Sequence, residues 1–135
     1  MTEKRQQVML AAMYHAKALR IHNTDWTIRI NFIKGMEKTR KVLAECGPDG
    51  HKVIGLNIDC SFPLYMLHNT IAHEMVHAKQ WIRGELSVKG DLMRWNGKKV
   101  SAKLAYQATP WEVEAMRSEI IMAHNFIDFL NSMKK

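Results

Sequence analysis

The sequence predicts an α+β fold in a single domain that spans residues 1–135. Two long stretches, one near the middle and one at the C-terminus, carry apolar residues at helical spacing, whereas short segments before residue 60 alternate apolar and polar residues. No internal repeat or low-complexity linker divides the chain. A chain of 135 residues is large enough to close one hydrophobic core. The predicted order is therefore helix, strands, helix, irregular insert and helix.

The first half of the chain is expected to contain one helix and three strands. Residues 3–21 have the helical pattern, and residues 26–32 alternate as a half-buried strand does. A second short strand is expected over residues 40–46. The sequence Gly-Pro-Asp-Gly at 47–50 is a strong turn signal, and it precedes a third alternating segment over residues 53–59.

The second half is expected to contain two long helices separated by an insert. Residues 63–83 form the first helix, which ends before Gly84, a residue type that favours the position after a helix. Within the insert, residues 98–105 are expected to form a short strand. The last helix covers residues 110–132, with Thr109 as its N-cap and a proline at its first position.

Composition favours a water-soluble cytoplasmic protein. Hydrophobic residues make up 47% of the chain and charged residues 24%, which is ordinary for a globular domain. No apolar stretch approaches the roughly 20 residues of a membrane helix, and we expect neither a signal peptide nor membrane contact. Cys46 and Cys60 are too few and too distant for a disulfide framework or a thiolate zinc cluster, and are expected to be buried free thiols.

The chain is basic, with a formal net charge of +7. A positive field favours acidic partners, including nucleic acid. The basic residues are nevertheless scattered, without a run of five like charges. The favoured interpretation is a solvated basic surface on a monomer, and weak contact with nucleic acid is the alternative.

One short motif points to metal chemistry: His73-Glu74-Met75-Val76-His77 matches His-Glu-x-x-His. On a helix, residues four apart differ by about 40° in direction and lie one turn apart, so both imidazoles reach one ion. Neutral imidazole suits zinc, and the adjacent Glu74 is placed to act on a water that the metal activates. A zinc site with a catalytic carboxylate is therefore predicted.

The surrounding helix places these histidines away from its apolar stripe. With His73 at 0° on a helical wheel, the apolar residues gather between about 120° and 200°. They are Leu64, Leu67, Ile71, Met75, Ala78 and Ile82. His73 and His77 lie near 0° and about 40°, beside Met66 and Thr70. Histidines that serve only in the core are expected inside the stripe.

A third ligand is expected from the last helix, with one position left for water. Glu112 lies in the middle of the face formed by Met116, Ala123, Phe126, Ile127 and Leu130, whereas Glu114 is expected to point outward. Glu119 also faces inward but two turns away, where it could support the site. Because a buried carboxylate must be paired or bound to metal, Glu112 is the favoured ligand, and pairing with an Arg or Lys is the alternative.

The remaining histidines do not extend the site. His124 lies about 18 Å along the helix axis from Glu112, too far to share an ion. His68 precedes His73 by five residues, which rotates it away from the pair. The others, interpreted as surface or structural residues, are His15, His22 and His51.

The active helix resembles that of SprT-like zinc metalloproteases. The resemblance rests on residues 73–78, followed by Trp81 and Gly84. That family usually takes its third ligand from a histidine soon after the helix. Here no histidine lies between His77 and His124, so this part of the pattern is missing.

The Glu-x-x-Ala of residues 112–115 is similar instead to the third-ligand helix of minimal gluzincins and IrrE-like peptidases, which implies Glu112 as a zinc ligand. Those families often have Asp or Asn after the alanine, where this chain has Met116. Together with Arg-Trp-x-Gly-Lys at 94–98, the pattern resembles small phage-encoded zincin-like proteins of unsettled role, over roughly residues 53–120, which implies a location in the cytoplasm of a host cell. It implies a minimal zincin-like fold: N-terminal helix, small antiparallel or mixed sheet, His-Glu-x-x-His helix and C-terminal third-ligand helix.

The resemblance implies a zinc metalloendopeptidase in which Glu74 is the general base. In related zincins the strand before the active helix holds an extended protein or peptide substrate, which here would be residues 53–59. Tyr106, just before the third-ligand helix, is the candidate for stabilising the oxyanion, although a packing role is equally open. For Trp95 and Trp111, core packing is favoured over walls of the cleft.

Three other functions fit the sequence less well. A zincin-fold binding protein with little turnover would not require an intact Glu74. A DNA-associated, SprT-like protease is compatible with the net charge of +7 and would show salt-dependent DNA retention. A structural zinc site is disfavoured, because three ligands beside a free carboxylate describe an open site better than a closed one.

Overall fold

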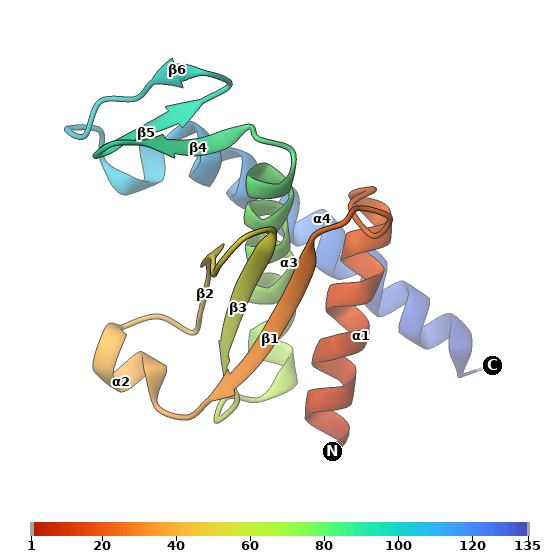
Figure 1. The fold of residues 1–135 in the computed structure, drawn as a ribbon. Coiled ribbons are helices and arrows are strands. Elements are labelled where there is room, and N and C mark those ends of the chain that lie inside the picture. The colour runs from red at the N-terminus through yellow and green to blue at the C-terminus, as the bar shows by residue number, and fades with distance from the viewer. Residues whose placement is uncertain (1, 135) are drawn as a thin grey trace.

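The structure, a computed structural model, describes residues 2–134, which form a mixed α+β arrangement of helices around two small sheets (Figure 1). The α+β prediction is therefore confirmed. In chain order the elements are α1 (Glu3–Ala18), β1 (Thr27–Ile33), α2 (Met36–Arg40), β2 (Ala44–Pro48), β3 (Val53–Asp59), α3 (Leu64–Ile82), β4 (Leu86–Lys89), β5 (Leu92–Trp95), β6 (Lys98–Lys99), the 3₁₀ turn η1 (Tyr106–Ala108) and α4 (Pro110–Met133).

The larger sheet has the strand order β1-β3-β2. β3 runs parallel to β1, with Thr27 opposite Val53, and antiparallel to β2, with Ala44 opposite Ile58. Since both sides of β3 are occupied, residues 53–59 have no edge to offer a substrate, and that expectation is wrong. The two edge strands of this sheet are β1 and β2, and β2 contacts α3.

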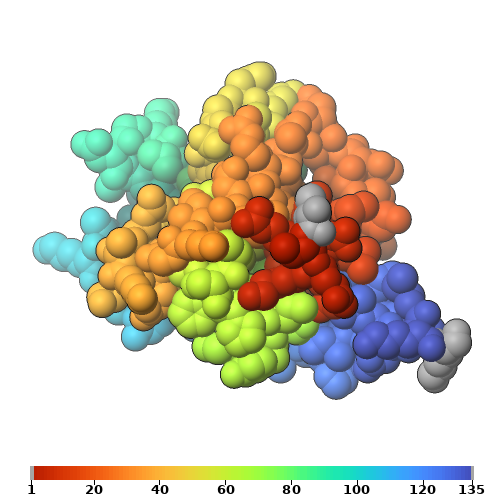
Figure 2. Space-filling view, turned by 90° about the horizontal axis from the view of Figure 1, so that it is seen from below, coloured from red at the N-terminus to blue at the C-terminus, as the bar shows by residue number. Residues whose placement is uncertain are grey.

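The core lies between this sheet and the helices. Alternation along β3 turns Ile54, Leu56 and Ile58 inward, where they are fully buried against α1 and α3. Figure 1 shows α3 running behind the sheet, and α4 crossing behind α3. At the lower face, seen in Figure 2, the start of α1 contacts the loop before α3, where Lys4 Nζ donates to the carbonyl of Cys60 (3.2 Å).

The long helix α3 is anchored as its periodicity predicts. Leu67, Ile71 and Met75 are fully buried, and burial of each such side chain stabilises the fold by about 1.5–3 kcal/mol. The helix ends as expected at a glycine, because Gly84 adopts a left-handed φ of 72°. Among residues 2–134, no helix has the length and apolar character needed to cross a membrane.

The insert between α3 and α4 differs most from the prediction. It folds as the antiparallel sheet β4-β5-β6 and projects from the body of the molecule (Figures 1 and 2). Only Lys98–Lys99 of the strand predicted over residues 98–105 forms. The turn between β5 and β6 is Asn96-Gly97, with φ of 51° and 82°. Asn-Gly is a strong hairpin signal, and the sequence interpretation missed it.

Smaller differences occur in the first half. α1 ends at Ala18 rather than residue 21. The second strand covers Ala44–Pro48 rather than residues 40–46, so that Pro48 belongs to an edge strand, where proline is tolerated. The short α2 was not predicted. Its start is held by the buried Asp59 carboxylate, which accepts backbone hydrogen bonds from Gly35 (3.4 Å) and Glu37 (3.1 Å). Cys46 and Cys60 are free thiols as expected, but they are half-buried rather than buried.

Candidate metal centre

His73 and His77 lie one turn apart on α3 and direct the same ring nitrogen toward Glu112 of α4. Their Nε2 atoms are 3.2 Å apart. His73 Nε2 lies 2.8 Å from Glu112 Oε1, and His77 Nε2 lies 3.1 Å from Oε2. One ligand atom from each residue lies within 4.8 Å of the other two, a spacing that could hold a metal ion. The three predicted ligands are thus brought together.

The charges within this trio are mutually attractive. Burial alone would raise the pKa of Glu112, but the contacts with His73 and His77 and the charge of His77 lower that pKa to about 2. Burial has the opposite effect on His73, whose pKa it would lower. The bond to Glu112 and the charge of Glu74 instead raise the pKa of His73 to about 9. Glu112, only 4% exposed, is therefore paired with histidines, and pairing with Arg or Lys is not observed among the described residues.

The opposite ring nitrogens are held by two further side chains. His77 Nδ1 lies 2.8 Å from the amide oxygen of Gln80, which is fully buried on the same helix. His73 Nδ1 lies 3.2 Å from a carboxylate oxygen of Glu119 on α4. Both acceptors require a proton on Nδ1, so in the neutral rings the lone pair is on Nε2. The tautomers that face Glu112 are thus those a metal needs.

Gln80 also connects the site to α4. Its amide nitrogen donates to the carbonyl of Trp111 (3.0 Å) and to Glu114 Oε1 (2.8 Å), while Lys79 Nζ donates to Glu114 Oε2 (2.9 Å) and pairs with Glu85 (3.0 Å). Because both partners of the Gln80 nitrogen are acceptors, its oxygen must be the atom that faces His77. The expectation that Glu114 points outward is wrong: it fastens α4 to α3.

Glu74 lies beside the trio and near β2. Its carboxyl interacts with the charges of His77, His73, Glu112 and Glu45 of β2. Burial is the largest influence and raises the pKa of Glu74 to about 7. A carboxyl group with this pKa takes up and releases a proton near neutral pH.

Tyr106 reaches the site from η1. Burial of its hydroxyl, together with the nearby negative charge of the Glu112 carboxylate, raises the pKa of Tyr106. The side chain as a whole is 68% exposed, so a core-packing role is not supported. The neutral phenol remains a hydrogen-bond donor at neutral pH, which is the property required of an oxyanion partner.

The other predicted residues lie outside the trio. Trp95 and Trp111 are half-buried and pack together, with ring centroids 6.5 Å apart, and thereby join the insert to α4. The inward face of α4 is narrower than predicted: Ala123 and Phe126 are buried, whereas Met116 and Ile127 are 39% and 37% exposed. The histidines judged unable to share the ion, including His124, do not belong to the group of potential metal ligands found among residues 2–134.

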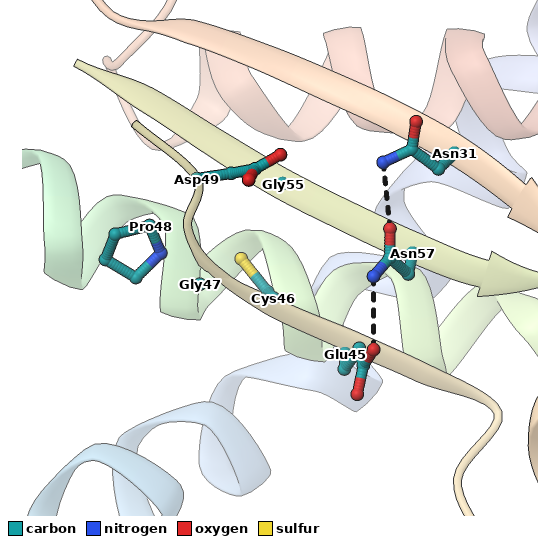
Figure 3. Close-up of a pocket in the computed structure, with 8 residues that line it drawn as sticks. All are labelled: Asn31, Glu45, Cys46, Gly47, Pro48, Asp49, Gly55 and Asn57. Atoms are coloured by element: carbon teal, nitrogen blue, oxygen red, sulfur yellow. Dashed lines mark hydrogen bonds between the residues drawn. The ribbon is translucent and has the colours of Figure 1, made fainter. Parts of the chain in front are cut away.

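A polar hollow of about 370 Å³ lies elsewhere, on the sheet face turned away from α3 (Figure 3). A row of hydrogen bonds crosses its floor, from Asn31 to Asn57 (2.9 Å) and from Asn57 to Glu45 (3.1 Å). None of the three predicted ligands lines it. The hollow is thus separate from the candidate metal centre.

Gln80 is the residue that sequence analysis missed. It lies three residues after His77, and on the helical wheel its direction is about 20° from that of His73. An amide on the histidine face of a predicted zinc helix was therefore a usable signal.

Comparisons with family models, curated proteins and solved structures found no match. The functional argument therefore rests on the geometry of this site.

Proposed function

We propose that this protein is a zinc-dependent metallopeptidase that hydrolyses peptide bonds. One observation carries the proposal: two histidines and a glutamate from two helices converge within 4.8 Å, with a second carboxyl group, that of Glu74, beside them. A core histidine cluster would not need this arrangement, because its polar atoms could be satisfied without a buried carboxylate.

The donor set fits zinc. Two imidazole nitrogens and one carboxylate oxygen are the three protein ligands of one class of catalytic zinc site, which leaves a fourth position open. His77 and His73 donate hydrogen bonds from Nδ1 to Gln80 and Glu119, so that their Nε2 sides are available. When bound, zinc supplies Lewis acidity that activates a water molecule and polarises a carbonyl group.

The chain's own residues supply the proton transfers. The Glu74 carboxylate accepts a proton from the attacking water and delivers it to the nitrogen of the departing amine. The Tyr106 hydroxyl, which lies beside Glu112, donates a hydrogen bond to the oxygen on which negative charge develops. Both roles remain as predicted from the sequence, and their positions beside the trio support them.

The substrate is expected to bind along β2 rather than β3. β2 is an edge strand that contacts α3, and Glu45 of β2 is close enough to Glu74 to influence the pKa of its carboxyl group. An extended peptide that pairs with the free edge of β2 would therefore pass near the general base.

Metal analysis tests the proposal. Purified wild-type protein is expected to contain near-stoichiometric zinc, to retain it in Glu114→Ala and to lose it in Glu112→Ala. The zinc-loaded wild type is expected to cleave members of a peptide library and to stop after chelation. Absence of zinc from wild type, or zinc that persists in Glu112→Ala, would overturn the proposed site.

The insert favours nucleic-acid contact as a second candidate function. Residues 86–105 contain five basic side chains, Lys89, Arg94, Lys98, Lys99 and Lys103, against the single acid Asp91. Arg94 and Lys99 are direct cross-strand neighbours, an arrangement that is unfavourable unless an anion compensates it. None of these five basic residues forms an ion pair within residues 2–134.

Retention on a DNA column tests this second candidate. Lys98→Ala and Lys99→Ala together are expected to lower the salt concentration that elutes the protein and to flatten its salt dependence. The matched control, Lys17→Ala with Lys38→Ala, removes two charges from α1 and α2. If both double variants lower the eluting salt concentration equally, the retention reflects net charge alone and not a site in the insert.

A further inference from the structure

We propose that a hollow beside the metal centre receives a large apolar side chain of the substrate, from a residue next to the cleaved bond. The inference rests on the proposed peptidase function and names the substrate class. The hollow, about 300 Å³, lies between the insert and the start of α4. That volume is at the lower end of the range for small-molecule sites, so it suits one side chain rather than a cofactor.

The lining of the hollow determines what it accepts. Apolar side chains come from both sides, with Leu92 and Met93 from β5, Leu104 from the segment after β6 and Trp111 from α4. Asp91 is the one charged side chain among the described residues that line it. An apolar substrate side chain gains from burial here, and an acidic one is repelled by Asp91.

None of the three ligands lines this hollow, but Tyr106 and Trp111 connect it with the metal centre. The Tyr106 side chain lines the hollow, and its hydroxyl lies within the electrostatic influence of the Glu112 carboxylate. Trp111, at the other wall, immediately precedes Glu112 in α4. A peptide carbonyl group that accepts a hydrogen bond from Tyr106 beside the metal centre therefore lies next to the hollow, and the adjacent side chain of the peptide is within reach of it.

Exposed apolar side chains at this place also support an occupant. Leu92 and Leu104 are 37% and 44% exposed, although they lie in an insert whose charged residues are mostly basic. Apolar groups that stay in contact with water beside a site are typical of a ligand groove. A Leu, Phe or Met side chain that filled the hollow would remove part of this surface from water.

The test compares two classes of zinc-binding ligand on the zinc-loaded protein. Acetohydroxamate carries the metal-binding group alone, whereas a peptidyl hydroxamate carries an isobutyl or a carboxymethyl side chain beside the same group. We expect the isobutyl compound to bind about 10–100-fold more tightly than the carboxymethyl compound, as measured by calorimetry.

Two substitutions locate the effect. Leu104→Asp, at an exposed position that a folded chain tolerates, is expected to abolish the isobutyl preference while acetohydroxamate binds unchanged. Ile121→Asp is the matched control: it makes a similar change on α4 at a side chain that is 65% exposed and outside the hollow, and the preference should persist.

The outcomes separate the two proposals. If acetohydroxamate binds but the isobutyl group brings no gain, or if Leu104→Asp leaves that gain intact, the hollow is not the subsite and the metal centre still stands. If the protein binds no zinc, the proposed function fails and this inference fails with it.

Discussion

Helix α3 carries histidines in two places, and their neighbours make them different. Near the start of the helix, His68 lies close to His15 of α1, and the Nδ1 atoms of both are buried without a hydrogen-bond partner in residues 2–134. Further along, His73 and His77 have acceptors at Nδ1 and share Glu112 at Nε2. Both pairs lie within the folded body, but only the second is surrounded by carboxylates.

The electrostatic consequences are opposite. Burial, with a smaller contribution from the charge of His68, lowers the pKa of His15 to about 4 and keeps the ring neutral. At His73 the effect of burial is outweighed by Glu112, Glu74 and Glu119, and the pKa rises to about 9. The second pair therefore attracts positive charge, whether a proton or a metal cation. The partners, rather than burial, distinguish candidate ligand histidines from core histidines.

The largest expected effect concerns catalysis, which should depend on the carboxylate-rich pair alone. Glu74→Gln removes the proton acceptor but no metal ligand. We expect the rate of peptide cleavage to fall by about 10²–10⁴-fold while zinc content stays unchanged. Steady-state kinetics on a peptide substrate, together with elemental analysis, measures both quantities.

His68→Gln is the matched control for the other histidine pair. It alters a histidine on the same helix, outside the trio, and should change neither zinc content nor kcat. Equal losses in the two variants would mean that the helix, rather than the Glu74 carboxylate, had been disturbed. Full activity in Glu74→Gln would remove Glu74 as the base.

Helical periodicity explains why much of this site could be predicted. A period of 3.6 separates the buried stripe of α3 from the face of His73 and His77, and it placed Glu112 inward on α4. It could not show that Glu114 reaches back to Lys79 and Gln80, because a helical wheel carries no information about the neighbouring helix. Side-chain contacts between helices depend on how the helices cross.

The order of strands in the sheet was less predictable, because it also depends on contacts between elements rather than on the pattern within one element. Alternation identified the segments that form β1 and β3, but it does not state which strands are neighbours. The position of β3 between β1 and β2 therefore contradicted the expected substrate edge. In the insert, strands of two to four residues are too short to show a period, and only the turn Asn96-Gly97 marked the hairpin.

The next largest effect should appear at the His15–His68 pair as the solution is acidified. The pKa of His15 is about 4 in the folded protein and about 6.5 in an unfolded chain, so the unfolded chain takes up the proton first. The contribution of the neutral His15 ring to the free energy of unfolding is therefore complete above about pH 6.5, and it is lost as the pH falls toward 4. The expected loss from this group is about 3 kcal/mol.

Urea unfolding of metal-free protein at several pH values between 7 and 4 measures this loss. His15→Phe removes the titrating group, and its stability should fall less than that of wild type over this range. His22→Phe alters an exposed histidine and should follow wild type. Parallel curves for wild type and His15→Phe would show that His15 is not the source of the acid sensitivity.

A smaller effect tests how the carboxylate-rich pair is positioned. Gln80→Met keeps the side-chain length but removes the acceptor for His77 Nδ1 and the donor for Trp111. We expect zinc affinity to fall by about 10–100-fold, since loss of such an orienting partner typically costs that much. Competition with a chromophoric chelator measures the zinc Kd directly.

Two companion variants make this result specific. Gln6→Met, at an exposed glutamine of α1, should leave the zinc Kd unchanged. Glu119→Gln retains an acceptor for His73 Nδ1, so it should weaken zinc binding less than Glu119→Ala does. If Gln80→Met binds zinc as wild type does, the tautomer of His77 does not depend on Gln80.

The smallest effect separates the clamp between α3 and α4 from the ligands themselves. Glu114→Gln keeps an acceptor for Gln80 but removes the charge that faces Lys79, whose side chain is 11% exposed. Lys79 retains Glu85, so we expect a destabilisation of only about 1 kcal/mol, with nearly unchanged zinc affinity. Asp49→Asn breaks the ion pair with Arg29, in which both side chains are 55% exposed, and should cost less in urea unfolding. Loss of zinc in Glu114→Gln would instead make Glu114 a ligand, because a clamp that acts only through packing and charge has no reason to abolish metal binding.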